Sequence, residues 1–112
     1  NPESWDRYWF KDAWSGWDVP RHYSVYKTKA LTRLLKKHGF RVKRVKSFTG
    51  RHGAMGISFD FWLKKKGVSE KKRQRFSKFF HSYTVRALTL PYFYFADALN
   101  RSAGMTVTFI KE

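Results

Sequence analysis

An amphipathic helix between residues 28 and 38 is the clearest pattern of apolar and polar positions in the chain. Leu31 and Leu35 recur at helical spacing among lysines and arginines, which predicts one apolar stripe. Thr28 is the expected N-cap, and Gly39 is expected to take the left-handed position that follows many helices. The pattern therefore predicts a helix over residues 28–38.

Two stretches alternate apolar and polar residues as strands do, residues 40–48 and residues 104–111. In the first stretch, Phe40 and Val42 share one face but Val45 falls on the other. This change of face predicts either a bulge in the strand or a strand that is partly buried on both faces.

A second helical pattern runs over residues 69–90, with a stripe of aromatic residues and basic first turns. Pro91 is expected to end or kink this helix. A further helical segment is expected at residues 92–100. Before these helices, residues 49–56 are interpreted as a glycine-bearing loop, and residues 57–63 fit either a helix or a strand.

Mixed reactive groups gather in the loop before the first strong helix. Asp18, Arg21 and His22 place a carboxylate, a guanidinium and an imidazole within five residues. Imidazole titrates near neutral pH, so His22 is a candidate catalytic base or substrate-orienting group. Asp18 would fix its tautomer, and Arg21 would hold an anionic group. The alternative also stays open: these side chains would only stabilise the conformation of the loop. The aromatic candidates for substrate binding beside this loop are Trp14, Trp17, Tyr23 and Tyr26.

The charge of the chain limits the classes of molecule that it would attract. The formal net charge is +16, and no acidic residue occurs between Asp18 and Asp60. Such a field attracts phosphates, anionic lipid surfaces or an acidic substrate, although basic residues also serve solubility. The chain has no cysteine, and its four histidines are far apart in sequence, so disulfides and a thiolate metal site are excluded and no metal is expected.

The segment from Trp14 to Phe40, which begins W-S-G-W-D-V-P-R-H, resembles the part of class I S-adenosylmethionine-dependent methyltransferases that follows the fifth strand of their sheet. Asn1-Pro2 is similar to the end of that fifth strand. Residues 104–112 are similar to the seventh and last strand. The positions that match the family motif are Asp18, Pro20, Arg21, His22, Gly39 and Phe40.

The resemblance implies an α/β fragment, the C-terminal part of a Rossmann-like methyltransferase sheet. Residues 1–112 would be a single or partial domain whose cofactor-binding half is absent. Residues 40–48 and 104–111 would form an antiparallel pair of strands. The helices over residues 28–38, 69–90 and 92–100 would flank this pair. One strand edge would stay unpaired, so self-association or a companion fragment is expected.

The function implied by the resemblance is methyl transfer from S-adenosylmethionine to an unknown acceptor. This part would form the acceptor pocket and lid and would be inactive alone, because the residues that bind S-adenosylmethionine are expected N-terminal to Asn1. The expected acceptor is a small or lipid-linked molecule, and the expected location is the cytoplasm, free or at the membrane periphery. The alternative is a basic, aromatic module that binds nucleic acid or an anionic membrane surface.

Overall fold

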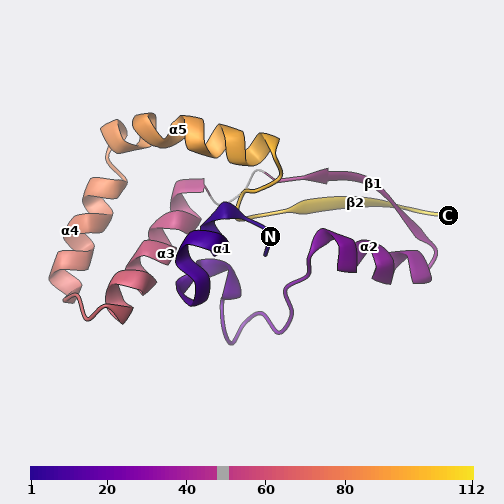
Figure 1. Cartoon of the computed structure of the whole chain (residues 1–112), viewed down its shortest axis with the longest axis horizontal. Helices are drawn as coiled ribbons and strands as arrows, with labels where there is room; N and C mark the ends of the chain where they lie inside the picture. The colour runs from indigo at the N-terminus through magenta and orange to yellow at the C-terminus, as the bar shows by residue number, and fades with distance from the viewer. Residues whose placement is uncertain (48–50) are drawn as a thin grey trace.

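The computed structural model of the chain describes residues 1–47 and 51–112 and has an α/β fold (Figure 1). The described residues form five α-helices and a two-stranded antiparallel sheet. The elements in chain order are α1 (Trp5–Phe10), the 3-10 helices η1 (Lys11–Ala13) and η2 (Ser15–Trp17), α2 (Thr28–Lys37), β1 (Phe40–Lys46), α3 (Arg51–Lys65), α4 (Glu70–Phe80), α5 (Tyr83–Ala98) and β2 (Thr106–Lys111).

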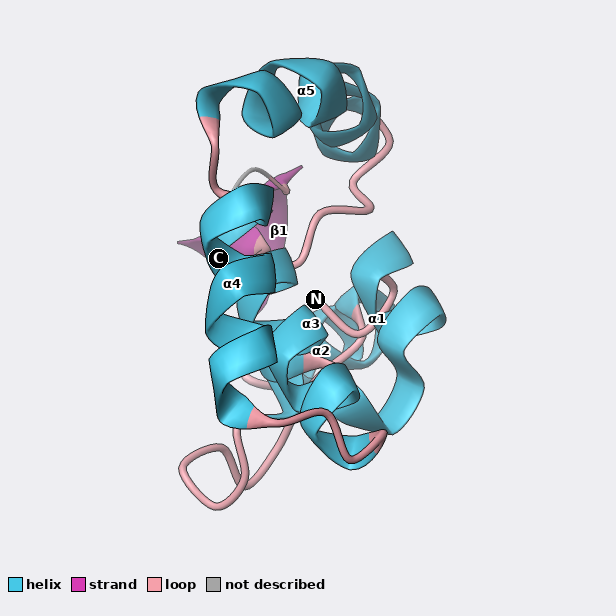
Figure 2. Ribbon diagram, turned by 90° about the vertical axis from the view of Figure 1, so that its left-hand side faces the viewer, coloured by secondary structure: helices cyan, strands magenta, loops and turns pink. Residues whose placement is uncertain are grey.

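The molecule is elongated, with extents of 53 × 30 × 17 Å. A helical body of α1, α3, α4 and α5 occupies one end. The sheet and α2 project from it as an arm (Figure 1). Figure 2 shows the helices of the body grouped together when this end faces the viewer.

The antiparallel pairing of the two strands confirms the expectation from the sequence. The register runs from Phe40 opposite Lys111 to Lys46 opposite Thr106, and it shifts between Val42 and Arg44. This irregularity is the predicted bulge. Because it adds one residue, half-buried positions can recur at 40, 42 and 45 despite the broken alternation. The strand ends at Lys46, and position 48, where the expected strand ended, lies outside the described residues.

The first strong helix is confirmed as α2, with one correction at its start. The N-cap is Lys27, and Thr28 is the first helical residue. The Thr28 hydroxyl instead lies 3.0 Å from the sulfur of Met105, just before β2. Thr28 is therefore engaged across the arm rather than with the first turn of its own helix. Gly39 follows the helix with a φ of +77°, as predicted.

The prediction of a loop at residues 49–56 is wrong from residue 51 onward, because Arg51–Lys65 is one helix of 15 residues. Positions 49 and 50 lie outside the described residues. Two glycines weaken the helical pattern by about 1 kcal/mol each. Burial of Met55 and Ser58 against the body offsets this cost. At Gly56, a Cβ would lie 2.6 Å from Cε1 of His81 at the end of α4, so a larger residue there would require the imidazole ring to shift.

The single helix expected over residues 69–90 is also wrong. The chain breaks at His81 and Ser82, which cap α4 and α5 respectively. The apolar stripe runs through both helices, so the pattern does not reveal the break. Pro91 lies inside α5 and does not end it, and the separate segment expected from residue 92 is part of the same helix. Burial of Phe93 and Ala96 holds α5 on the body despite the lost hydrogen bond.

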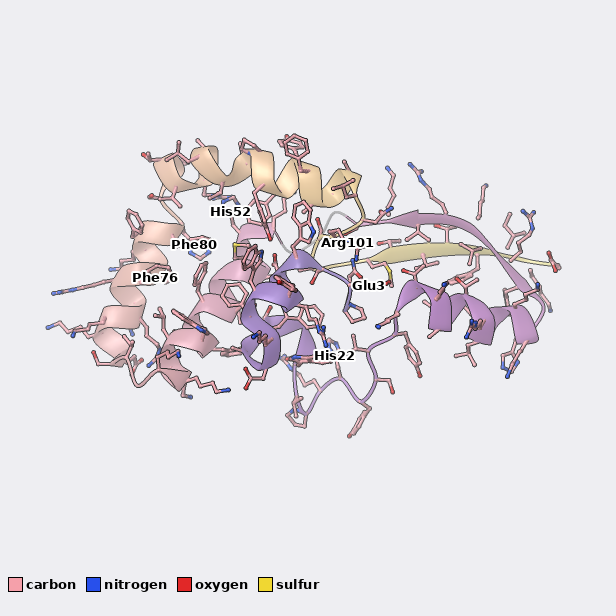
Figure 3. The ribbon with its side chains drawn as sticks, viewed as in Figure 1. Glu3, His22, His52, Phe76, Phe80 and Arg101 are labelled. Carbon is pink, nitrogen blue, oxygen red and sulfur yellow. The ribbon has the colours of Figure 1, made fainter. Side chains whose placement is uncertain are left out.

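Aromatic and apolar side chains of the helical body form the core. The core residues are Phe10, Ala13, Trp14, Met55, Phe80 and Phe93. The aromatic stripe of α4 is part of it, because Phe76 and Phe80 each lie against Phe59 of α3 with ring centroids about 5 Å apart (Figure 3). No helix in the described part of the chain has the length and apolar character required to cross a bilayer.

Candidate functional site

A tight turn brings the three reactive side chains of the predicted loop together. Asp18 takes a left-handed conformation, with φ of +41°, and its carbonyl accepts from the backbone N–H groups of Arg21 and His22 at 2.8 and 3.1 Å. The Arg21 guanidinium donates to Asp18 Oδ1 from Nε at 3.1 Å and from Nη2 at 2.8 Å. Nδ1 of His22 lies 3.7 Å from Asp18 Oδ2. One carboxylate therefore faces both a guanidinium and an imidazole.

These three residues line a cavity of about 450 Å³ between the loop, α3 and the segment that leads into β2. The other lining residues are Ser15, Gly16, Ala54, Ile57, Phe61, Ala103 and Gly104. The side chains of Arg21 and His22 are 82% and 58% exposed, whereas that of Asp18 is 28% exposed. The cavity thus has an apolar wall on α3 and reactive groups within reach of solvent.

The aromatic residues predicted beside the loop lie outside the lining of this cavity. Trp14 is 2% exposed and belongs to the core. Trp17 packs edge-on against Trp14 at 5.4 Å between ring centroids, and its Nε1 donates to the carbonyl of Lys11 at 2.8 Å. Tyr23 and Tyr26 are both exposed to solvent. Of the predicted site residues, the cavity therefore gathers Asp18, Arg21 and His22.

Two serines, one of them buried, hold the loop on α3, which sequence reasoning missed. The Ser15 amide donates to Ser58 Oγ at 2.9 Å, and the hydroxyls of Ser15 and Ser58 both donate to the carbonyl of Ala54, at 2.9 and 3.0 Å. Ser58 is fully buried. The sequence does contain a signal for this contact: Ser58 lies on an apolar helix face, four residues after the small residue Ala54. These bonds fix where the reactive turn begins.

The start of the chain lies at the entry to β2, beside the cavity. The Asn1 ammonium donates to the carbonyl of Ala103 at 2.7 Å, and the Asn1 side-chain amide donates to the carbonyl of Ser102 at 3.0 Å. The Ser102 amide in turn donates to the hydroxyl of Ser47, just beyond β1, at 2.8 Å. Asn1, the end of β1 and the start of β2 therefore meet at one end of the sheet. Ala103 also lines the cavity, so the cavity reaches this end of the sheet.

A second polar cluster, also missed from the sequence, ties α3 to α5. Nη2 of Arg51 donates to Asp97 Oδ2 at 2.7 Å, and the hydroxyl of Ser102 donates to the other carboxylate oxygen. The guanidinium also lies 5.1 Å from the ring centroid of Tyr94. This cluster fixes α5 against the entry to β2.

Two buried groups away from the cavity have shifted pKa values. Burial raises the pKa of Asp6 to about 6, although the hydrogen bond that its Oδ1 accepts from Tyr92, at 3.1 Å, acts in the opposite direction. Burial lowers the pKa of His52, and the nearby charge of Arg86 adds to this effect. The ring nitrogen Nε2 of His52 lies 2.6 Å from the hydroxyl of Thr89. His52 is thus a buried residue that links α3 to α5.

Within residues 1–47 and 51–112, no group of three or more His, Asp or Glu side chains is arranged to hold a metal ion. Comparisons with protein-family models, with curated proteins and with solved structures found no match to this chain.

Proposed function

We propose that this chain forms the acceptor-binding part of an α/β methyltransferase that uses S-adenosylmethionine. The observation that carries the proposal is the position of Asn1 against Ala103, at the entry to β2. A strand that ended at Asn1 would run antiparallel to β2 along its outer edge. Among the described residues, that edge has no strand partner. In a methyltransferase sheet, the last strand lies in the same way between the fifth strand and the sixth. The strand that ended at Asn1 would be the fifth, β1 the sixth and β2 the last.

The open shape of the arm supports the same proposal. The radius of gyration is 16.1 Å, whereas a compact chain of this length has a value of about 13 Å. Two strands with one covering helix make a poor core, because sheets of this size gain stability only from further strands or layers. Additional strands on the β2 edge would supply that core.

The location of the cavity supports a role in binding the methyl acceptor. In open α/β sheets, ligands bind beyond the carboxyl ends of the strands. The cavity lies at the carboxyl end of β1, and it would lie at the carboxyl end of any strand that ended at Asn1. The turn with Asp18, Arg21 and His22 would then face both the acceptor and the methyl donor.

The proposal does not require the described residues to hold S-adenosylmethionine on their own. The only carboxylate in the cavity, Asp18, is already bonded to Arg21. The cofactor, which supplies an electrophilic methyl group when bound, would be held by residues upstream of Asn1.

Each residue of the turn has a separate role in the proposal. His22 Nε2 is the atom proposed to accept a proton from the oxygen or nitrogen of the acceptor, while Asp18 holds the other side of the ring. Arg21 would bind an anionic group of the acceptor, because its guanidinium is exposed beside the cavity. The apolar wall of α3 would exclude water from the reacting atoms.

The proposal is tested with the protein encoded by the whole reading frame. That frame should encode, upstream of Asn1, a strand followed by a glycine-rich turn, and the protein should bind S-adenosylmethionine. Titration calorimetry measures this binding directly, without knowledge of the acceptor. A reading frame that begins at or just before Asn1, or a whole protein without affinity for S-adenosylmethionine, would refute the proposal.

A second candidate function, binding to an anionic membrane surface, is favoured by the outer face of α5. Tyr83, Tyr94 and Phe95 are between 59% and 93% exposed there. An apolar helix face of this kind beside a cationic neighbour is typical of interfacial helices. The cationic residues of α4 are Lys71, Lys72, Arg73, Arg75 and Lys78. Sedimentation with phosphatidylglycerol vesicles but not with phosphatidylcholine vesicles would support this function, and equal behaviour with both would exclude it.

A further inference from the structure

The helical body contains a groove on the side of α3 away from the reactive turn. It has a volume of about 550 Å³, which lies within the range of about 300–1,000 Å³ that is usual for small-molecule sites. Residues of α1, α3 and α5 line it: Trp9, Phe10, Met55, Phe59, Trp62, Leu88, Thr89 and Tyr92. Its lining is almost entirely apolar, yet Trp9 and Leu88 are 63% and 76% exposed. Large apolar side chains exposed around a hollow are typical of a binding site.

One stripe of α3 forms the floor of this groove. Met55, Phe59 and Trp62 lie at helical spacing, and Lys66, just past the end of the helix, continues the same stripe. With a rise of about 1.5 Å per residue, the stripe from Met55 to Lys66 is about 16 Å long. The floor is therefore long and narrow, a shape that suits an extended chain better than a compact ring system.

The groove ends in a basic hollow. A second cavity of about 330 Å³ shares Trp9, Phe10 and Trp62 with the groove. Its remaining lining residues are Lys11, Asp12, Lys65 and Lys66.

The basic hollow keeps an excess of positive charge. Lys65 is bonded to Asp12. In contrast, Lys11 and Lys66 have no carboxylate partner in the part of the chain that the structure describes. The ammonium of Lys66 lies 5.8 Å from the ring centroid of Trp62, at the boundary between the two hollows. The apolar floor of the groove therefore leads directly to two ammonium groups, those of Lys11 and Lys66, that have no carboxylate partner among the described residues.

We propose that this groove binds a single-chain anionic amphiphile, with its hydrocarbon tail on Met55, Phe59 and Trp62 and its anionic head at Lys11 and Lys66. The tail gains from burial of apolar area, and the head gains from the local positive charge. The volume, the linear floor and the position of the lysines at one end all match such a molecule. The chemistry required is a monomeric amphiphile such as a long-chain fatty acid, and a bilayer surface is the alternative that the test must exclude.

The proposed site is separate from the cavity that holds the reactive turn. Ala54 and Ile57 of α3 line that cavity, whereas Met55 and Phe59 line the groove, so α3 presents a different face to each. The inference depends only on the groove and requires no methyl transfer. Its test therefore reads binding alone, and its failure would leave the proposed function untouched.

Binding is measured by titration calorimetry of the protein with myristate below its micelle concentration. We expect saturable binding of one myristate per chain. Each methylene removed from the tail should weaken binding about fourfold, because burial of one methylene contributes about 0.8 kcal/mol. A trimethylammonium amphiphile with the same tail should bind more weakly than myristate, because its positively charged head is repelled by the lysines.

Two variants with matched controls locate the bound molecule. Leu88→Asp should weaken myristate binding about tenfold or more, whereas Phe95→Asp, on the exposed face of the same helix but outside the groove, should not change it. Lys66→Glu should weaken binding about twofold to fivefold, in the range of exposed ion pairs. Lys64→Glu, which makes the same change of charge on α3 outside both hollows, should have less effect. Circular dichroism confirms that all four variants fold.

The proposal is overturned by the absence of saturable binding or by equal affinities for anionic and cationic amphiphiles. It is also overturned by an equal loss of affinity in the groove variants and their controls. Stronger loss in Phe95→Asp than in Leu88→Asp would assign the binding to the outer face of α5 and to a membrane surface instead. Loss confined to Leu88→Asp and Lys66→Glu supports the groove.

Discussion

The indole ring of Trp14 occupies the space that a side chain at Gly16 would need. Trp14 is almost fully buried, so the ring cannot move aside without disturbing the core. The turn with Asp18 and Arg21 begins directly after this contact. The absence of a side chain at residue 16 therefore lets the reactive turn lie against the core.

Gly16→Ala should lower the free energy of unfolding by about 1–3 kcal/mol, the usual cost of forcing extra atoms into a packed core. Urea denaturation measures the change. Gly53→Ala is the matched control, because a Cβ at Gly53 in α3 would meet nothing within 4 Å. That variant should be more stable than the wild type by roughly 0.5–1 kcal/mol, since alanine favours helix. Equal destabilisation by both changes would contradict the contact.

Asp6 should make the protein less stable as the pH rises from about 4 to about 6. Its pKa is raised to about 6 from 3.8, so in this window the folded state binds its proton more tightly than the unfolded state does. The loss amounts to about 3 kcal/mol at most, because one pKa unit corresponds to about 1.4 kcal/mol. Asp6→Asn should remove this dependence. Urea denaturation at several pH values between 3 and 8 checks it.

Tyr92→Phe provides a second check on the same carboxylate. The hydrogen bond from Tyr92 lowers the pKa of Asp6, so its removal should move the window of falling stability to higher pH. An unchanged window would mean that the hydroxyl of Tyr92 does not act on Asp6.

Ser58→Ala should destabilise the protein by about 1–3 kcal/mol, because the change leaves the partly buried Ser15 amide without its acceptor. Thermal unfolding followed by circular dichroism measures the loss. Ser24→Ala, at an exposed position in the loop, is the control and should have the stability of the wild type. A Ser58→Ala protein as stable as this control would show that the bond to Ser15 contributes nothing.

His22→Ala tests the proposed base. In the whole protein, this change should lower turnover about 10²–10⁴-fold, the range of general base catalysis, and leave the affinity for S-adenosylmethionine nearly unchanged. His38→Ala, at the end of α2 and outside the cavity, is the matched control and should keep its turnover. Unaltered turnover in His22→Ala would assign His22 a structural role in the turn.

The sequence predicts those elements whose pattern is local. The helix α2 and both strands follow from apolar spacing, and the proximity of Asp18, Arg21 and His22 follows from their separation of at most four residues. The start of α3, residues 51–56, was missed because its glycines weaken the helical pattern and burial against the body offsets their cost, whereas the pattern of residues 57–63 fits either a helix or a strand. The contact of Asn1 with Ala103 joins positions 102 residues apart, so no local pattern could indicate it.

The bulge in β1 has a consequence for insertions and deletions in the arm. Lys43 is the residue without a partner in the register between Val42 and Arg44. Removing it would make Val42 and Arg44 consecutive in the strand, as their partners Phe109 and Thr108 already are. Phe40, Val42 and Val45 would then keep one face in strict alternation. The arm should therefore tolerate the loss of this one residue, whereas a deletion between Phe40 and Val42 would move Phe40 to the opposite face.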